Sequence, residues 1–582
     1  MKTLNKFISD KPKSIGFGVI GLFAIIAEIV VICTSDGLYS FAAKSWMLAF
    51  LTFVISLAWN YGAKTIINEV KAYKKTSLLL VVCIGLAIVI ALRCLGWYPL
   101  SSIVGKYIFV IQLIMIPVVI LGMLGIFVWK LKYWKLYLLI GTFVGLGMML
   151  VMPIGGVPDE VVHINSAYRI SNFMLGISNT ADSMPMRMDD FNMLQHSYAF
   201  SQYHDIAGFE SYITQLLTPL NNSSLVVAQT SHVSPYFCYL FPAIGITIGR
   251  LFGLGCYQTF MIGRLLNFAI FMFLTTYAVS VIPVEKLPMI ILLLMPMTVQ
   301  QGMSYSYDVY VNGLSMIAIA YAVKIALTDS KPFLSKKEKI ILALSTCLLL
   351  PIKHFSYFLI SFLPWMILFW KTHPLKKDTV NHIKKIIATC VILLIIAIVI
   401  WGLTGASSYK YSDVYLSYNP TEAGYSIGYF IAHPFELLPV CINTITRFGR
   451  FYLYSFAGES LGWLDLELPK IISIGFFVIL FLSVLKRKDS IVNIPKKVKK
   501  LFAIVAVLTI CFIFAGLLLC WSPISGGCIL GVQGRYFIPV GLLLLLLLYS
   551  DDILIDKRVD KYLLATALML IFFAVEYIIL RY

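Results

Sequence analysis

The chain has few charged residues and, over one long stretch, no lysine. Charged residues make up 13% of the 582 residues and hydrophobic residues 60%, and the mean hydropathy is +0.88. This composition excludes a soluble globular protein. Acidic residues are scarcer than basic ones, 28 against 46. In a membrane protein, lysine-rich cytoplasmic loops explain such an excess, so it does not indicate a nucleic-acid partner.

Paired cysteines and a cleavable leader are also missing. None of the 11 cysteines forms a Cys-x-x-Cys motif, and most lie inside apolar runs. They are predicted to be small buried residues, not a disulfide framework or a zinc site. The first apolar run, 15–32, follows a lysine-rich flank but has no Ala-x-Ala cleavage site. We therefore predict that it is a retained membrane span.

Continuous apolar runs of spanning length, roughly 20 residues each, recur along the chain. They predict an all-α, polytopic transmembrane protein with about 15 spans and exclude a barrel, whose strands would alternate. The predicted spans are 15–34, 46–62, 77–95, 107–129, 136–153, 264–282, 289–304, 309–327, 340–351, 355–370, 386–405, 471–485, 501–521 and two more before the C-terminus.

The distribution of lysine sets the predicted orientation. Lysines flank the first span and fill the loops at 63–76 and 130–135, but none occurs between Lys135 and Lys286. Translocated loops are poor in lysine, so the N-terminus is predicted to be cytoplasmic and loops 154–258 and 406–469 to lie outside. The apolar piece that ends near Leu254 contains Arg250 and several glycines and prolines. We expect it to be a juxtamembrane helix on the outer surface.

Two adjacent carboxylates open the first outer loop. Gly155 and Gly156 end the preceding helix, and Pro158 suits the first turn of a new one. Asp159 and Glu160 would then lie at a helix N-terminus, where the helix dipole stabilises negative charge. His163, four residues after Asp159, shares its face and could orient it by hydrogen bonding. The alternative is that this segment only caps a helix.

Further charged residues are predicted at the same outer face. Asp308 precedes a span, Lys353 and His354 lie in an outer turn, and Arg535 follows another outer segment. A carboxylate there can accept the proton of an attacking hydroxyl, and a cation can stabilise a departing phosphate. This combination is typical of sugar transfer from a lipid-phosphate donor.

Each of these residues also has a structural alternative. Asp308 can cap the following helix. Arg169 and Arg535 can extend to lipid head groups, and His163 can be a buried structural histidine. The aromatic residues of the outer loops can form only the interfacial belt.

An ordered set of short motifs resembles the bacterial membrane-protein family DUF2142, over about residues 145–550. The motifs include Pro158-Asp159-Glu160, Tyr168-Arg169, Pro235-Tyr236, Gly249-Arg250, Gly263-Arg264, Tyr307-Asp308, Gly462-Trp463 and Gly534-Arg535-Tyr536. This family looks related to the GT-C glycosyltransferases. The resemblance implies a transmembrane GT-C-like core at 136–550, an N-terminal four-helix extension at 1–135 and a C-terminal helix at 551–582.

The resemblance also implies roles for residues. It implies catalysis by Asp159 or Glu160 and a role for Asp308 in metal or substrate binding. From their own chemistry and predicted outer position, His163, Arg169, Lys353, His354 and Arg535 are also expected to bind the substrate or its phosphate. No cofactor is certain, although Asp159 and Asp308 could hold Mg²⁺ or Mn²⁺. We choose Asp159 as the base, because adjacent helical side chains diverge by about 100° and Asp159 shares its face with His163.

The sequence therefore predicts an inverting glycosyltransferase of the bacterial plasma membrane. It would transfer a sugar from a polyprenyl-phosphate donor to a cell-envelope or teichoic-acid-like glycan at the outer face. Partner enzymes would make or flip the lipid-linked sugar. The alternatives are a transporter or flippase of lipid-linked glycans, a glycan polymerase or ligase using diphosphate donors, and a non-catalytic envelope scaffold.

The predicted orientation is testable by thiol labelling. Single cysteines replace Ser183 and Lys336 in a cysteine-free background. A membrane-impermeant reagent should label position 183 in intact cells, and position 336 only after permeabilisation. Labelling of position 336 from outside, or protection of position 183, would refute the orientation.

Overall fold

Long apolar helices account for most of the chain, because a bilayer offers no hydrogen-bond partners and helices satisfy their backbone groups internally. The computed structural model describes residues 74–98, 101–201, 205–233, 235–373, 414–416, 419–490, 492–549 and 553–581. Within these residues, six helices are long and apolar enough to cross a membrane. They are α5 (Ile103–Phe127), α6 (Tyr133–Val151), α11 (Cys256–Val281), α14 (Asp308–Leu327), α21 (Lys496–Trp521) and α23 (Val559–Arg581).

Other helices pack among these six. They are α4 (Lys74–Trp97), α12 (Lys286–Leu293), α13 (Pro296–Gly302), α15 (Lys336–Leu349), α16 (Phe358–Thr372), α20 (Lys470–Val484) and α22 (Ile538–Leu547). The predicted total of about 15 spans is therefore not confirmed. The predicted spans at 15–34, 46–62 and 386–405 lie outside the described residues.

One predicted span is wrong in detail. The segment 289–304 is not a single helix but is divided between α12 and α13, with the break at Leu294 and Met295. Met295 is extended (φ −60°, ψ 142°) because the ring of Pro296 disfavours helical geometry in the residue before it. Both halves are buried, so the break lies inside the protein.

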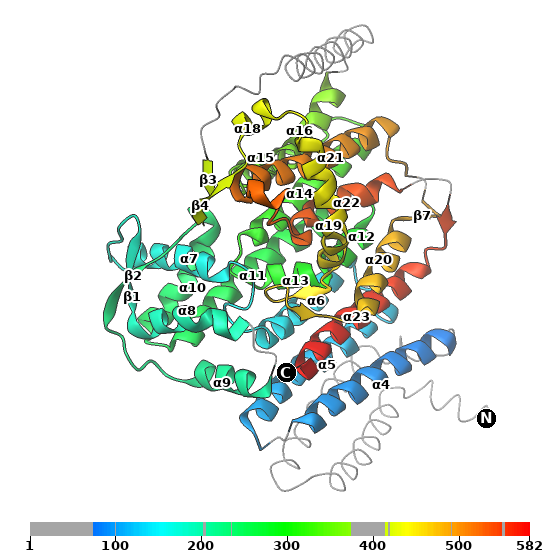
Figure 1. The fold of residues 1–582 in the computed structure, drawn as a ribbon. Coiled ribbons are helices and arrows are strands. Elements are labelled where there is room, and N and C mark those ends of the chain that lie inside the picture. The colour runs from blue at the N-terminus through cyan, green and yellow to red at the C-terminus, as the bar shows by residue number, and fades with distance from the viewer. Residues whose placement is uncertain are drawn as a thin grey trace, which may run out of the picture.

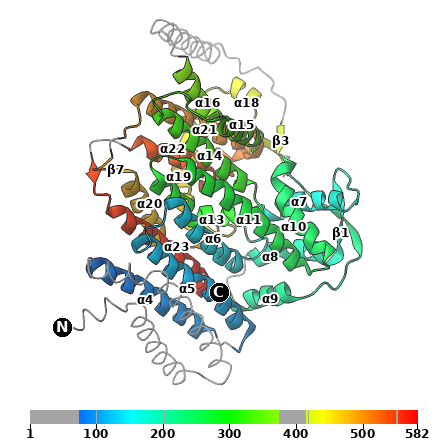
Figure 2. The same ribbon diagram turned by 180° about the vertical axis from the view of Figure 1, so that it is seen from behind.

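Helix α14 forms the centre of the bundle. Within its most apolar stretch of 18 residues, 94% of the residues are buried inside the protein. It contacts α11, α15, α16 and α22, whereas α23 contacts α4, α5, α6 and α20. Figures 1 and 2 both show α4, α5 and α23 side by side along one flank. The terminal helices therefore cover the core and leave α14 inside it.

The predicted outer loop 154–258 forms a helical layer at one end of the bundle. It contains α7 (Glu160–Met174), β1 (Ser183–Arg187), α8 (Met188–Ser201), α9 (Ile206–Leu217), β2 (Leu225–Gln229), η1 (Tyr236–Tyr239) and α10 (Leu240–Leu251). The strands pair antiparallel, with Ser183 opposite Gln229. Helix α10 packs tightly along α11, because a Cβ on Gly245 would lie 2.7 Å from Gly263. The two figures show this layer on one side of the bundle.

Residues 414–467 form a second irregular region. It contains β3 (Val414–Leu416), β4 (Asn419–Gly424), α18 (Ile427–Ala432), α19 (Leu437–Ala457), β5 (Ser460–Leu461) and β6 (Leu466–Glu467). Two 3-10 turns, η3 (Ile524–Gly526) and η4 (Gly534–Phe537), follow α21. Helix α19 contacts η4 and α13, so this region meets the same end of the bundle as α7. We call this end the site end.

Basic loops meet at the opposite end, which we call the basic end. There β7 (Lys486–Arg487) pairs with β8 (Leu554–Ile555), and Arg487 forms an ion pair of 2.5 Å with Asp560. The hydroxyl of Tyr133 donates to the same aspartate at 3.0 Å. Figure 1 shows β7 and β1 on opposite sides of the molecule. The separation of the two ends agrees with the division of charge in the sequence.

Candidate active site

A buried ion pair shapes the segment that enters the site. Glu160 is 0% exposed and accepts from Arg264 of α11, with Nε to Oε1 at 2.8 Å and Nη2 to Oε2 at 2.5 Å. The backbone N–H groups of Gly155 and Tyr305 donate to the same carboxylate at 2.8 and 3.2 Å. The guanidinium also donates to two carbonyls that follow α6. Glu160 therefore joins α6, α11 and the turn before α14.

The predicted helix start at Pro158 is wrong. Helix α7 begins at Glu160, and Asp159 precedes it with left-handed backbone (φ +64°). This conformation turns the two carboxylates apart. The Asp159 side chain is 58% exposed and accepts from Nη2 of Arg535 at 3.1 Å. Of the two adjacent acids, only Asp159 is therefore accessible to a substrate.

Asp308 and Lys353 form a second ion pair beside Asp159. The carboxylate of Asp308, at the first residue of α14, lies 2.5 Å from the ammonium of Lys353. The ammonium also lies 4.1 Å from the centre of the Tyr536 ring and 5.2 Å from that of Tyr307. Two aromatic faces and one carboxylate thus fix the position of this cation.

The turn that carries Lys353 is strained. Lys353, His354 and Phe355 have φ angles of +50°, +51° and +65° in succession. Left-handed backbone costs a non-glycine residue about 1–3 kcal/mol and persists where the surrounding structure enforces it. Here the strain places the ammonium of Lys353 over Asp308, while the side chains of His354 and Phe355 are exposed.

Arg535 lies between the two aspartates. Its side chain is 4% exposed, and its Nε lies 3.9 Å from Oδ2 of Asp308. The preceding Gly534 lets η4 approach α19, since a Cβ there would lie 2.2 Å from the nitrogen of Phe456. The Tyr357 hydroxyl donates to the Tyr536 carbonyl at 2.9 Å and holds the other side of η4. Nε and Nη1 of Arg535 have no hydrogen-bond partner among the described residues.

His163 adjoins these charges but is not itself charged at neutral pH. Burial lowers the pKa of His163 to about 4, against the opposing influence of Asp159 and Asp308. Its Nδ1 lies 2.7 Å from the hydroxyl of Tyr239, and its ring makes an edge-to-face contact with the ring of Tyr307. His163 therefore bonds to Tyr239 and not to Asp159 as we expected. At neutral pH it could contact a phosphate only as a neutral hydrogen-bonding group.

The structure brings together four of the predicted residues and separates three. Asp159, Asp308, Lys353 and Arg535 form one group, which we call the charge cluster, with His163 beside it. The other three are Glu160, Arg169 and His354.

The three separated residues have other positions. Glu160 is sealed by Arg264, so it cannot meet a substrate and its predicted catalytic role is corrected to a structural one. Arg169 lies about 14 Å further along α7 and donates to the carbonyls of Thr180 and Ser183. His354 directly follows Lys353, but its side chain is exposed and takes part in none of the ion pairs found among the described residues.

Sequence reasoning assigned no role to Arg264, Tyr307 or Tyr536, although all three lie in the recognised motifs. Arg264 interrupts an apolar span, and a buried guanidinium requires a counter-charge. That signal could have identified Glu160 as its partner. The aromatic residues gave no comparable signal, because tyrosines are frequent in every outer segment of the sequence.

The charge cluster does not fit a divalent cation. Asp159 and Asp308 both face Arg535, and Lys353 occupies the other side of Asp308. Among the described residues, no group of three or more His, Cys, Asp or Glu side chains has the arrangement of a metal site. The positive charge that a metal would supply is provided here by a guanidinium and an ammonium.

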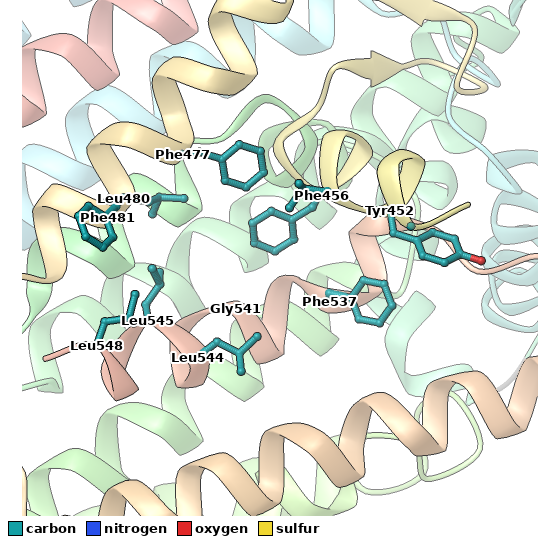
Figure 3. Close-up of a pocket in the computed structure, with 12 residues that line it drawn as sticks. Tyr452, Phe456, Phe477, Leu480, Phe481, Phe537, Gly541, Leu544, Leu545 and Leu548 are labelled. Carbon is teal, nitrogen blue, oxygen red and sulfur yellow. The ribbon is translucent and has the colours of Figure 1, made fainter. Parts of the chain in front are cut away.

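An apolar groove shares the turn η4 with the charge cluster, although no residue of the cluster lines it. It has a volume of about 590 Å³ and lies between α19, α20 and η4–α22 (Figure 3). Its lining includes Tyr452, Phe456, Phe477, Phe537 and Leu548. Phe537 lies two residues after Arg535 in η4, so one short turn contributes to both the groove and the cluster. Along α22 the lining extends about 17 Å, roughly half the hydrocarbon thickness of a bilayer.

The different environments of the two adjacent acids predict different effects on stability. Glu160→Gln removes the charge opposite a buried guanidinium and should destabilise the protein by about 3–5 kcal/mol. Asp159→Asn, at an exposed position, should cost no more than about 1 kcal/mol. Thermal unfolding of the purified full-length variants in one detergent measures both effects. Equal melting temperatures for the two variants would contradict the assignment of Glu160.

Comparison with known proteins adds one finding. No curated protein and no solved structure matches the chain. One family model, described as a predicted membrane protein (DUF2142), matches residues 142–544. This range contains the whole charge cluster and every groove residue except Leu545 and Leu548, and it agrees with the extent of the motifs in the sequence. The chain therefore belongs to the DUF2142 family of predicted membrane proteins.

Proposed function

We propose that this protein transfers a sugar from a polyprenyl-phosphate donor to a cell-envelope or teichoic-acid-like glycan at the outer face of the membrane. One observation carries the proposal: an accessible carboxylate, Asp159, lies 3.1 Å from a buried guanidinium, Arg535, and the short turn that holds Arg535 also contributes Phe537 to an apolar groove. The turn η4 thus connects a base and a phosphate-binding cation with a place for a lipid chain. The resemblance to GT-C glycosyltransferases supports the same chemistry.

Asp159 is suited to accept the proton of the acceptor. The acceptor hydroxyl oxygen forms a bond to the anomeric carbon of the donor sugar, and its proton passes to the Asp159 carboxylate. The bond between the anomeric carbon and the phosphate oxygen breaks, and its electron pair stays on the phosphate. Attack opposite the leaving group inverts the anomeric centre. The 58% exposure of Asp159 leaves room for the acceptor on this side.

Arg535 and Lys353 are suited to bind the departing phosphate. Two nitrogen atoms of Arg535, Nε and Nη1, have no hydrogen-bond partner among the described residues, although the side chain is buried. Buried donors in this state favour an anionic ligand, because otherwise their desolvation is not compensated. Asp308 keeps both cations in place and limits the net charge of the cluster.

The apolar groove is suited to the prenyl chain. Its lining is almost entirely aliphatic and aromatic, and it lies between α19, α20 and η4–α22 (Figure 3). A lipid can therefore enter from the bilayer with its phosphate directed toward η4. This arrangement favours a lipid-linked donor over a soluble nucleotide-sugar.

Substitution of Asp159 tests the transfer step. Asp159→Asn keeps the side-chain size and removes the base, so activity should fall roughly 10²-fold or more. The measurement is the glycan composition of the envelope in a deletion strain that expresses each variant at equal abundance. Asp182→Asn is the matched control, since Asp182 is an exposed acid in the same layer, outside the charge cluster.

Two results would contradict the enzyme proposal. Normal glycan modification by Asp159→Asn would show that this carboxylate is not the base. Loss of lipid-linked sugar translocation, with transfer unchanged, would favour a flippase instead.

Filling the groove tests the donor class. Gly449 has space for a side chain, since the nearest atom to an added Cβ is 3.6 Å away, and Gly449 lines the groove. Gly449→Leu should lower the affinity for polyprenyl phosphate at least tenfold without lowering the melting temperature. Native mass spectrometry of the detergent-solubilised protein measures retained lipid. Gly516→Leu, on α21 and also in open space, is the control and should bind as the wild type does. Equal binding by both variants would exclude the groove as the lipid site.

A further inference from the structure

One buried carboxyl group of a membrane-spanning helix does not belong to the charge cluster. Glu576 belongs to α23 and is 1% exposed. It lies beyond the family-matched residues 142–544 and has no part in the proposed transfer. Helix α23 packs there against α4 and α5. A carboxyl group at such a position is costly and requires an explanation.

Only one of the two carboxyl oxygens of Glu576 accepts a hydrogen bond from Gln112. Nε2 of Gln112, on α5, donates to Oε2 of Glu576 at 2.8 Å. The other oxygen of each side chain, Oε1 of Glu576 and Oε1 of Gln112, has no hydrogen-bond partner among the described residues. The unpaired atoms of this pair are therefore two acceptors, and no donor from the described residues reaches either of them.

No cation compensates this carboxyl group in the described part of the chain. Glu576 takes part in none of the ion pairs found there. Of the helices packed against α23, α4 contributes the Cys94 thiol, which hydrogen-bonds to Glu576, with Arg93 near that thiol. Helix α5 contributes Gln112, and α6, α12 and α20 contribute no charged group that reaches it. A carboxylate anion would thus be desolvated and unpaired.

A proton on Oε1 of Glu576 removes both the uncompensated negative charge and the lack of a hydrogen-bond donor. It neutralises the carboxyl group and converts Oε1 from an acceptor into a donor, and the unpaired Oε1 of Gln112 supplies the matching acceptor. A carboxylic acid and a primary amide then form two reciprocal hydrogen bonds, with N–H to O=C and O–H to O=C. Buried polar groups are stable when all their hydrogen bonds are made.

We propose that Glu576 is a proton-binding site within the membrane. It holds one proton at neutral pH as the neutral acid, and its pair with Gln112 fastens α23 to α5. The site is independent of the proposed glycosyl transfer and lies between the two terminal parts of the chain, outside the matched core.

Infrared difference spectroscopy of the full-length protein in lipid tests this proposal. The carbonyl stretch of a protonated carboxylic acid is separate from the bands of a carboxylate. Subtraction of the Glu576→Gln spectrum from that of the wild type at neutral pH should leave one protonated-acid band. Glu467→Gln, which removes an exposed glutamate in β6, is the control and should leave only carboxylate bands at the same pH.

A second variant keeps the test decisive if Glu576→Gln does not fold. Gln112→Leu retains the acid and removes its amide partner, so the protonated-acid band should persist and shift to the frequency of a less strongly hydrogen-bonded acid. The proposal is overturned if the wild type minus Glu576→Gln difference contains only carboxylate bands. It is equally overturned if a carboxylate band of Glu576 responds to added Na⁺ or K⁺, which would indicate a metal-ion site, or if Gln112→Leu leaves the acid band unshifted.

Discussion

The ion pair between Glu160 and Arg264 is the interaction on which the arrangement of the site depends. It is fully buried, and its carboxylate also accepts two backbone N–H groups from separate segments. A buried carboxylate cannot remain charged without such compensation. Because the pair fixes the chain around residues 152–160, the preceding carboxylate, Asp159, is directed outward by its left-handed backbone. Glu160 thus holds the segment in place, and Asp159 is left exposed.

The charge cluster at the end of this segment has equal numbers of positive and negative side chains, but not all of its hydrogen-bond donors have partners among the described residues. Two carboxylates, Asp159 and Asp308, face two cations, Arg535 and Lys353. The opposite charges offset one another, while Nε and Nη1 of Arg535 have no hydrogen-bond partner in the part of the chain that the structure describes, and the proposed phosphate site rests on these two atoms. The strained turn at Lys353 supplies one of the cations, and η4 supplies the other and also begins the apolar groove. The charged side chains, the strained turn at Lys353 and the turn η4 thus lie together at the site end of the bundle.

The sequence predicts the class of fold and most of the charge cluster for a simple physical reason. Charges at the ends of apolar runs are costly, so Asp159, Asp308, Lys353 and Arg535 are conspicuous, and alternation of lysine-rich and lysine-poor loops places them on one side. The sequence does not predict which of two adjacent acids is buried. That choice depends on Arg264, 104 residues away, and on the sign of one φ angle. The layer formed by α7 to α10 is also beyond prediction, because its segments are short, polar and only weakly periodic.

The most direct test is a structure of the full-length protein in lipid with polyprenyl phosphate bound. The account predicts density for the phosphate in contact with Arg535 and Lys353, next to Asp159, and density for the prenyl chain along α22 in the groove. Both cations should then contact phosphate oxygens rather than the aspartates alone. A phosphate bound elsewhere, with the ion pairs of the charge cluster unchanged, would contradict the assignment of this site.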